Sequence, residues 1–279
     1  MPSLYCLGLG YTALALARRL RAEGWQVGGT TQDAAKATAL EAEGIAATTD
    51  PAAAATAIGA ATHLLASIPP DADGDPALRL WSDAIRHHPG LAWAGYLSTT
   101  GVYGDRDGGW VDEESKLEPT GERGRRRVEA EAAWAALSPG VPVHFFRLAG
   151  IYGPGRSALD TVRAGRAQRV VKPGQVFSRI HVDDIVQVLA ASIARPRPGA
   201  VYNVCDDNPA PPDEVVAYAC ALLGLAPPPE IPFETASLSE MARSFYADNK
   251  RVANARIKTE LGVRLTYPDY RAGLMALVG

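Results

Sequence analysis

The sequence has few cysteines, no long hydrophobic run and little net charge, and each shortage excludes a class of protein. Cys6, Cys205 and Cys220 are the three cysteines among 279 residues, and they fit neither a disulfide framework nor a metal site, so we expect a reducing cytoplasm. The apolar run Leu4–Leu7 is too short for a signal peptide, and no stretch approaches the roughly 18 apolar residues of a membrane-spanning helix. A net charge of −3 gives no field that would attract nucleic acid or a membrane surface.

The chain also lacks the catalytic motifs of several enzyme classes. It contains neither the G-x-S-x-G elbow of hydrolases nor a Walker phosphate loop. His181, Asp183 and Asp184 stand close together, but no further ligand follows at metal-binding spacing, so we expect no metal site. With 47% hydrophobic and 21% charged residues, the composition is that of an ordinary soluble globular protein.

Short apolar runs alternate with helical patterns along most of the chain. Runs that are apolar throughout are typical of strands buried on both faces, and their alternation with helices predicts right-handed βαβ units. We therefore expect an α/β fold with a Rossmann-type, doubly wound parallel sheet of about seven strands and a small C-terminal substrate lobe. The predicted strands are Leu4–Leu7, Gln26–Thr30, Ile45–Thr48, His63–Ser67, Trp93–Ser98, Val143–Leu148 and Val201–Val204.

The pattern changes after about residue 155, where glycine, proline and arginine become frequent and the elements shorten. We predict an NAD(P)-binding domain over residues 1–155, with the strand at 201–204 returning to its sheet. Residues 156–180 and 206–279 then form a smaller substrate-binding lobe. The expected binding site is the cleft at the carboxyl ends of the strands.

A glycine-rich turn follows the first predicted strand and opens a predicted helix over residues 12–23. Gly8, Gly10 and Ala13 fit the pattern G-x-G-x-x-A, which in this context indicates dinucleotide binding. Gly8 permits the tight turn, Gly10 lets the main chain approach a pyrophosphate, and Ala13 allows close packing of helix on sheet. The alternative is a structural turn that binds no ligand. The predicted cofactor residues of the turn are Gly8, Gly10, Tyr11, Thr12 and Ala13.

The end of the second strand bears on the choice between NAD and NADP. An acidic residue there would bind the ribose hydroxyls of NAD, but the expected position holds Thr30 or Thr31. Asp33 lies slightly late and could instead cap the next helix. Both cofactors stay open; we favour NADP because two hydroxyls can donate to a phosphate. Thr30, Thr31, Gln32, Asp50, Ser67 and Ile68 complete the predicted cofactor residues of the first domain, and Asp50 has an exposed loop as its alternative.

Four segments resemble those of the extended short-chain dehydrogenases/reductases, the NAD-dependent epimerase/dehydratase superfamily. In order these segments are Ser98–Asp105, Arg147–Arg156, Arg179–Ile185 and Gly199–Val204. Their separations match the superfamily across nearly the whole chain. The G-x-G-x-x-A turn and a degenerate Tyr-x-x-x-Lys motif resemble its atypical branch.

The resemblance implies roles for a few positions. Thr99 corresponds to the hydroxyl residue that holds the reacting oxygen of the substrate, while Thr100 and Gly101 replace the acidic pair of the dehydratases. The catalytic tyrosine and lysine correspond to Arg123 and Arg127. Arginine stays protonated up to about pH 12, so Arg123 is no general base, whereas Arg127 could bind the nicotinamide ribose or a phosphate. The alternative for both arginines is a solvated helix start.

Other side chains could supply what the missing pair does not. Tyr103 and Tyr152 follow strands and are candidate acids, although each could equally be a packing tyrosine with a satisfied hydroxyl. Arg179 and Lys172 are candidates for holding an anionic substrate group, with a surface salt bridge as the alternative.

The sequence thus predicts an NAD(P)-binding oxidoreductase or epimerase that acts on a small hydroxy, carbonyl or sugar-derived compound. The alternative is a non-catalytic NAD(P)-binding sensor or regulatory protein, which explains the missing tyrosine more simply. The expected partner is a small-molecule substrate, with neither nucleic acid nor membrane. The resemblance also implies a homodimer through the helix around residues 128–137, where Val128, Ala132, Ala135 and Ala136 form an apolar face.

Overall fold

The computed structural model describes residues 1–278, and the chain divides into two compact units. Unit 1 comprises Met1–Thr99, Arg125–Arg147 and Val186–Tyr202. Unit 2 comprises Thr100–Gly124, Leu148–Ile185 and the residues from Asn203 on. The chain therefore passes between the units several times, and the domain boundaries given above stay a prediction.

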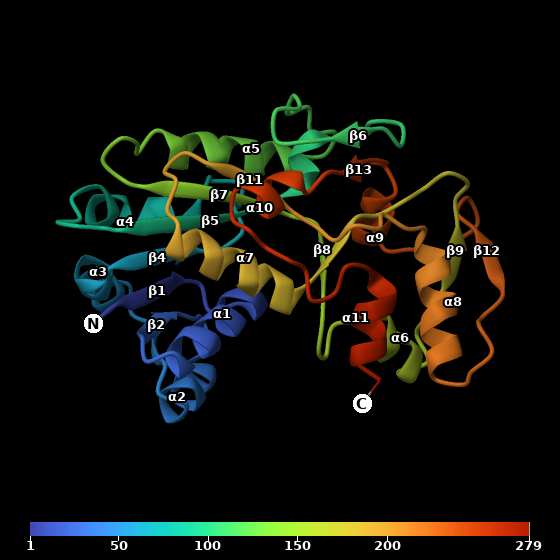
Figure 1. The fold of residues 1–279 in the computed structure, drawn as a ribbon, viewed down its shortest axis with the longest axis horizontal. Coiled ribbons are helices and arrows are strands. Elements are labelled where there is room, and N and C mark those ends of the chain that lie inside the picture. The colour runs from blue at the N-terminus through green and yellow to red at the C-terminus, as the bar shows by residue number, and fades with distance from the viewer. Residues whose placement is uncertain (279) are drawn as a thin grey trace. The chain divides into compact units, whose positions relative to one another are not determined.

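A seven-stranded parallel sheet forms the centre of the fold, as the sequence predicts (Figure 1). Its chain order reverses at β1, the arrangement that defines a doubly wound sheet. All seven predicted strands are confirmed, with ends that differ by at most one residue. In spatial order the strands are β11 (Val201–Val204), β7 (Val143–Leu148), β5 (Trp93–Thr99), β4 (His63–Ala66), β1 (Ser3–Leu7), β2 (Gln26–Thr30) and β3 (Ala46–Thr48).

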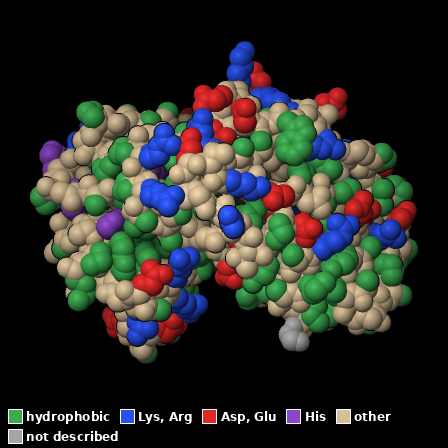
Figure 2. Space-filling view, viewed as in Figure 1, with side chains coloured by type: hydrophobic (Ala, Val, Ile, Leu, Met, Phe, Trp, Pro, Cys, Tyr) green, Lys and Arg blue, Asp and Glu red, His purple; other side chains and the backbone are tan. Residues whose placement is uncertain are grey.

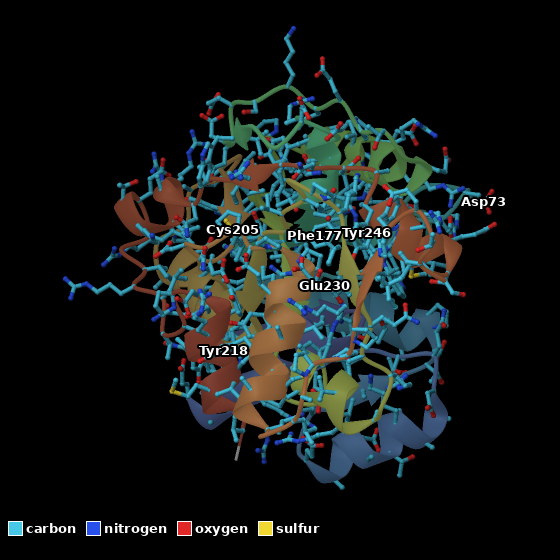
Figure 3. All side chains as sticks on the ribbon, turned by 90° about the vertical axis from the view of Figure 1, so that its right-hand side faces the viewer. Asp73, Phe177, Cys205, Tyr218, Glu230 and Tyr246 are labelled. Atoms are coloured by element: carbon cyan, nitrogen blue, oxygen red, sulfur yellow. The ribbon has the colours of Figure 1, made fainter. Side chains whose placement is uncertain are left out.

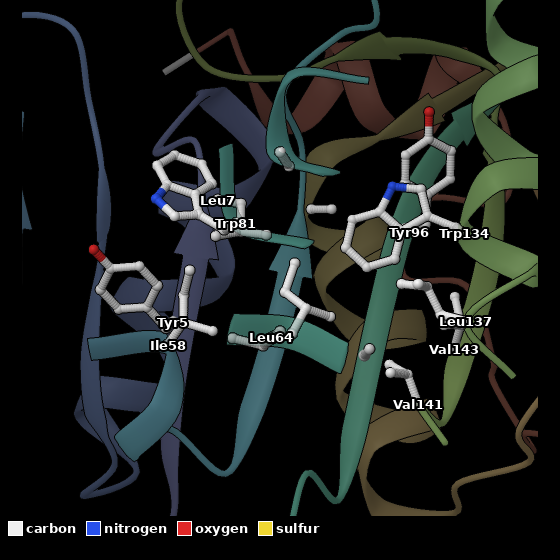
Figure 4. Packing of buried hydrophobic residues seen from close by; sticks show 14 of the residues in the cluster. Tyr5, Leu7, Ile58, Leu64, Trp81, Tyr96, Trp134, Leu137, Val141 and Val143 are labelled. Carbon is white, nitrogen blue, oxygen red and sulfur yellow. The ribbon is translucent and has the colours of Figure 1, made fainter. Parts of the chain in front are cut away.

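Helices cover both faces of the sheet in unit 1 because successive side chains of each strand point to opposite sides. On one face Tyr5 and Leu7 pack in a single core cluster with side chains of α3 (Pro51–Ala60), α4 (Pro76–Arg86) and α5 (Glu122–Ala135) (Figure 4). The clustered residues include Ile58, Trp81, Trp134, Tyr96 and Val143. On the other face α1 (Tyr11–Ala22) buries Ala13, Leu16, Ala17 and Leu20, the apolar stripe that its sequence predicts. The remaining helices of this unit are α2 (Ala34–Ala42) and most of α7 (Val182–Ala194).

Unit 2 is built from short elements around two smaller cores. The first core joins α6 (Ala158–Arg163), α8 (Pro212–Leu222) and α11 (Tyr270–Ala276). The second lies around Val170, Ala236 and Tyr246, and Figure 3 shows Tyr246 beside Phe177, whose ring centroid is 5.3 Å away. The further helices of unit 2 are η1 (Thr100–Tyr103), α9 (Glu240–Phe245) and α10 (Ala255–Thr259). The short strands of unit 2 pair as β6 (Trp110–Val111) with β13 (Arg251–Val252), β8 (Gly150–Tyr152) with β10 (Arg179–His181), and β9 (Arg169–Val171) with β12 (Glu230–Pro232).

The surface carries both charges. Figure 2 shows basic side chains lying among acidic ones on the face in view, in keeping with the net charge of −3. Within residues 1–278, no helix combines the length and the apolar character that crossing a bilayer requires.

Candidate functional site

The turn after β1 is held in shape by three neighbouring strands of unit 1. Gly8 has a φ of +94°, in the region that favours glycine, and its N–H donates to Thr30 Oγ1 at the end of β2 (2.8 Å). Ser67 Oγ, just past β4, donates to the Gly8 carbonyl (2.5 Å). A Cβ at position 8 would lie 2.8 Å from Ile68 Cγ1. The turn thus brings together Gly8, Thr30, Ser67 and Ile68, all predicted cofactor residues.

Gly10 occupies the opposite kind of environment. It is exposed, it is the N-cap of the twelve-residue helix α1, and no side chain caps that helix. Its φ of −76° suits any residue, and a Cβ built there would meet nothing within 4 Å. The helix thus begins at an exposed glycine with no side-chain cap, the arrangement that binds phosphates in dinucleotide folds. Behind them Thr12 and Ala13 are buried and Tyr11 is half-buried.

The segment after β2 uses its polar side chains locally. Asp33 Oδ1 accepts the N–H groups of Ala35 (2.9 Å) and Lys36 (3.1 Å) and so caps α2, the alternative role foreseen for it. The Thr31 hydroxyl accepts the Asp33 N–H at 3.3 Å, and Gln32 is exposed. The Thr30 oxygen accepts the Gly8 N–H and Thr30 is buried, whereas Thr31 is half-buried, so Thr31 is the more accessible of the two hydroxyls.

A lysine that the sequence analysis missed reaches the same turn. Lys36 lies in the first turn of α2, and its Nζ donates to the Leu9 carbonyl over 2.7 Å. The available signal was a lone lysine shortly after β2, in a helix otherwise rich in alanine. This contact places an ammonium group beside the glycine-rich turn.

The predicted cofactor residue Asp50 and the predicted catalytic residue Thr99 lie at the ends of other strands. Asp50 caps α3, since its Oδ1 accepts the Ala52 N–H at 2.9 Å, and the residue is exposed. Thr99 is the last residue of β5 and is half-buried. The residue before it, Ser98, is buried and donates to Glu131, which also binds Arg147 through two contacts of 2.8 and 3.1 Å. Ser98 is therefore part of a buried ion-pair network.

Arg127 has a defined place in unit 1. One guanidinium nitrogen donates to the Leu97 carbonyl (2.7 Å) and to the Tyr96 hydroxyl (3.1 Å), and the group lies 5.6 Å from the Tyr96 ring centroid. Burial raises the pKa of Tyr96, so this phenol stays protonated at neutral pH. Arg127 is thus tied to β5, two residues before Thr99, and is not a freely solvated side chain.

Arg123 is one helical turn earlier on α5 and is exposed. Its guanidinium carbon lies 5.6 Å from the ring centroid of Phe245, within unit 2. The side chain therefore stacks on an aromatic ring at the surface of this unit.

The two candidate tyrosines of unit 2 are both engaged. Tyr103 is fully buried and its hydroxyl donates to Asn203 Oδ1 over 2.7 Å. Tyr152 is buried, with its hydroxyl 3.4 Å from the Asp269 carbonyl. Burial, together with the nearby carboxyl groups of Asp206 and others, raises the pKa of Tyr152. These placements match the packing role that was the alternative for each tyrosine.

The two candidate substrate cations of unit 2 bind main-chain carbonyls. Lys172 Nζ donates to the Tyr246 carbonyl over 2.5 Å, and Arg179 donates to the carbonyls of Phe177 (2.9 Å) and Ala210 (3.0 Å). Burial lowers the pKa of Arg179. Asp206, which the sequence did not suggest as a site residue, is a neighbour of Arg179: its N–H donates to the Arg179 carbonyl over 2.7 Å. Asp206 is 1% exposed, and burial raises its pKa to about 8.

In the part of the chain that the structure describes, neither a metal-binding cluster nor the pocket of unit 2 coincides with the predicted site residues. Among residues 1–278, no group of three or more His, Cys, Asp or Glu side chains could hold a metal ion. In unit 2 a pocket of about 520 Å³ contains the ion pair of Asp207 and Lys258, but none of the predicted site residues lines it. The glycine-rich turn of unit 1, which brings together Gly8, Thr30, Ser67 and Ile68, is therefore the candidate site.

Comparison with known proteins agrees with this fold over the whole chain. No family model matches the chain. It is 30% identical to the protein YeeZ of Escherichia coli K12 over a 285-residue alignment, which covers 96% of this chain and 97% of YeeZ. A functionally unknown conserved protein from Silicibacter pomeroyi DSS is 53% identical, with a TM-score of 0.93 and coverage of 100% of this chain and 98% of that one.

Two further solved structures are more distant. A putative NAD-dependent epimerase/dehydratase from Methylobacillus flagellatus is 27% identical, with a TM-score of 0.73 and coverage of 99% and 97%. The dTDP-glucose 4,6-dehydratase of Bacillus anthracis, solved in complex with NAD, is 17% identical and shares the fold with a TM-score of 0.81 over 100% and 96% of the two chains. The chain belongs to the family of YeeZ and has the fold of the NAD-dependent epimerase/dehydratase superfamily.

Proposed function

We propose that this protein binds NAD or NADP, with the pyrophosphate at the turn between β1 and α1. The observation that carries the proposal is Gly10, which leaves the uncapped amino end of α1 open while Gly8 is locked by its neighbours. A structural turn has no need of an open N-cap, because a serine or aspartate would cap the helix better. A dehydratase of the same fold carries NAD, which supports the proposal.

We further propose an oxidoreductase or epimerase that acts on a small hydroxy, carbonyl or sugar-derived substrate. A bound nicotinamide would supply or accept a hydride. The Thr99 hydroxyl would hold the reacting oxygen, and Arg127 would add positive charge beside the end of β5. Tyr103 and Tyr152 have engaged hydroxyls, so we propose that the proton is carried by an ordered water.

The alternative proposal is a non-catalytic sensor of the nicotinamide pool. Two placements favour it: Arg127 is bonded to Leu97 and Tyr96, and Arg123 stacks on Phe245 where the superfamily carries its tyrosine. A protein that only binds the cofactor needs no phenol and no lysine at these positions. The cofactor site is common to both proposals.

Calorimetric titration with oxidised and reduced NAD and NADP tests the binding proposal. We expect at least one of the four to bind with a 1:1 stoichiometry, and absence of heat and of any shift in Tm with all four would refute it. The absorbance of the reduced nicotinamide, followed across a panel of aldehydes, ketones, polyols and sugars, then separates the two functions. Turnover supports the enzyme, and binding without turnover supports the sensor.

We also propose that the protein forms a homodimer and is cytoplasmic, as the sequence suggests. On α5, Val128 is half-buried and Ala132 and Ala135 are exposed, as is Ala136 directly after the helix, which leaves the proposed homodimer face uncovered within one chain. Light scattering at the mass of one 29.5 kDa chain would refute the dimer. All three cysteines are free and buried, which supports the proposed cytoplasmic location.

A further inference from the structure

We infer that Lys36 binds the 2′-phosphate of NADP and so makes this protein NADP-preferring. The inference rests on the proposed cofactor site and adds to it the residue that selects between the two cofactors. In doubly wound folds the side chains at the carboxyl end of the second strand meet the 2′ position of the adenosine ribose. A cation there favours a phosphate, and a carboxylate favours the free hydroxyls.

The contacts of Lys36 hold its ammonium beside the glycine-rich turn and the carboxyl end of β2. Its Nζ donates to the Leu9 carbonyl (2.7 Å), and the Leu9 N–H donates to the Thr30 carbonyl at the last residue of β2 (2.7 Å). The Thr30 hydroxyl in turn accepts from Gly8 (2.8 Å). Lys36, the end of β2 and the glycine-rich turn are therefore joined by consecutive hydrogen bonds within unit 1.

The charge of Lys36 is also available to a ligand. An ammonium has three N–H donors, and the Leu9 contact uses one of them on a neutral carbonyl. The arginines of the same βαβ stretch are occupied: Arg18 binds Glu43 through two contacts, and Arg19 binds Glu23 at 3.0 Å. The guanidinium of Arg21 lies against Gly44, at the other end of α1. In this stretch, Lys36 is thus the cation that faces the cofactor turn.

The competing residue is Asp33, whose carboxylate would favour NAD. Its Oδ1 accepts two main-chain N–H groups at the start of α2, so this carboxylate caps the helix. The positive end of the helix offsets part of its charge. The two threonine oxygens accept main-chain N–H groups, Thr30 from Gly8 and Thr31 from Asp33, and each hydroxyl has a single neutral O–H to donate to a phosphate. The balance of charge at this end of β2 therefore favours a 2′-phosphate.

The test compares the affinities of NADPH and NADH for the wild type and for variants of Lys36. We expect wild type to bind NADPH more tightly than NADH, and 2′,5′-ADP to displace NADPH better than ADP does. Lys36→Met keeps the side-chain length and should weaken NADPH binding by roughly 10- to 100-fold, the loss of one charge-assisted hydrogen bond, with NADH unchanged. Lys36→Arg should retain the preference. Arg19→Met, which removes a cation distant from the turn, serves as the matched control and should change neither affinity.

The possible results separate this inference from the proposed function. If no nicotinamide nucleotide binds wild type, the proposed function fails and the inference fails with it. If wild type prefers NADH, or if Lys36→Met weakens both cofactors equally, the site exists but Lys36 only supports the turn, and the inference is wrong. A selective loss of NADPH and of 2′,5′-ADP in Lys36→Met alone supports it.

Discussion

Gly8 and Gly10 are two residues apart, yet the fold requires only the first of them. Gly8 combines a positive φ with two close neighbours, Ser67 and Ile68. Gly10 has an ordinary backbone conformation and free space around it. A glycine that folding does not require, at the open end of a helix, points to a ligand that does require it.

Replacing Gly8 by alanine should therefore destabilise the protein whether or not cofactor is present. The new Cβ adds left-handed backbone strain and an overlap with Ile68 Cγ1, at 2.8 Å, and with Ser67 Oγ, at 3.0 Å. We expect the free energy of unfolding to fall by about 2 kcal/mol. Urea denaturation measures this directly, and an unchanged midpoint would show that the turn is looser than described.

Asp206 should make stability depend on pH in an unusual direction. Its pKa is raised by burial to about 8, against an ordinary value of 3.8, so the folded state holds a proton that the unfolded state has lost. Its contribution to stability is therefore complete below about pH 4 and declines as the pH rises towards 8. Relative to Asp206→Asn, wild type should lose stability across this range. A stability difference that stays constant from pH 4 to 8 in matched denaturation curves would contradict the account.

At the scale of residues, the glycine-rich turn could be predicted because its constraints are local. The roles of Lys36 and Asp206 could not be predicted, because they depend on tertiary contacts. The spacing of Gly8, Gly10 and Ala13 is a property of five consecutive peptide units and the helix after them. The role inferred for Lys36 depends on its contact with Leu9, and the raised pKa of Asp206 depends on its burial in the folded chain. No short sequence pattern carries that information.

At the scale of elements, short runs that are apolar throughout predicted all seven strands of the central sheet. α1 begins and ends one residue before the predicted helix over 12–23, and Gly24, with its φ of +86°, follows the C-cap residue Glu23. The six short strands of unit 2 were not predicted. Each has two or three residues and pairs with a strand distant in sequence, so neither periodicity nor a turn signal marks it.

Replacing two helical glycines by alanine should change the free energy of unfolding in opposite directions. Gly59 in α3 is exposed with nothing within 4 Å of a new Cβ, so Gly59→Ala should raise stability by about 0.5–1 kcal/mol. Gly273 in α11 lies against the Tyr152 phenol, and a Cβ there would overlap its ring. Gly273→Ala should therefore lower stability by about 2 kcal/mol. Similar effects of the two substitutions in thermal or urea unfolding would show that Tyr152 does not pack on α11.

At the scale of the whole molecule, the chain is a doubly wound sheet combined with a second unit of short elements. The predicted residues divide between them: unit 1 contains the glycine turn, Thr99 and Arg127, while unit 2 contains Tyr103, Tyr152, Lys172 and Arg179. Four side chains of unit 2 that were candidates for chemistry are bonded within that unit. The cofactor site is thus the part of the proposal with the most support, and the substrate chemistry depends on it.

The most direct test is a titration of wild type and Gly10→Ser with NADPH and NADH, with the unfolding free energy of both proteins measured alongside. Serine can cap α1 and fits the open space, so stability should stay equal or rise by about a few tenths of a kcal/mol. Its side chain would occupy the place of the pyrophosphate, so affinity should fall by roughly 10- to 100-fold. If Gly10→Ser binds either cofactor as wild type does, or if wild type binds neither, the open end of α1 is not a cofactor site.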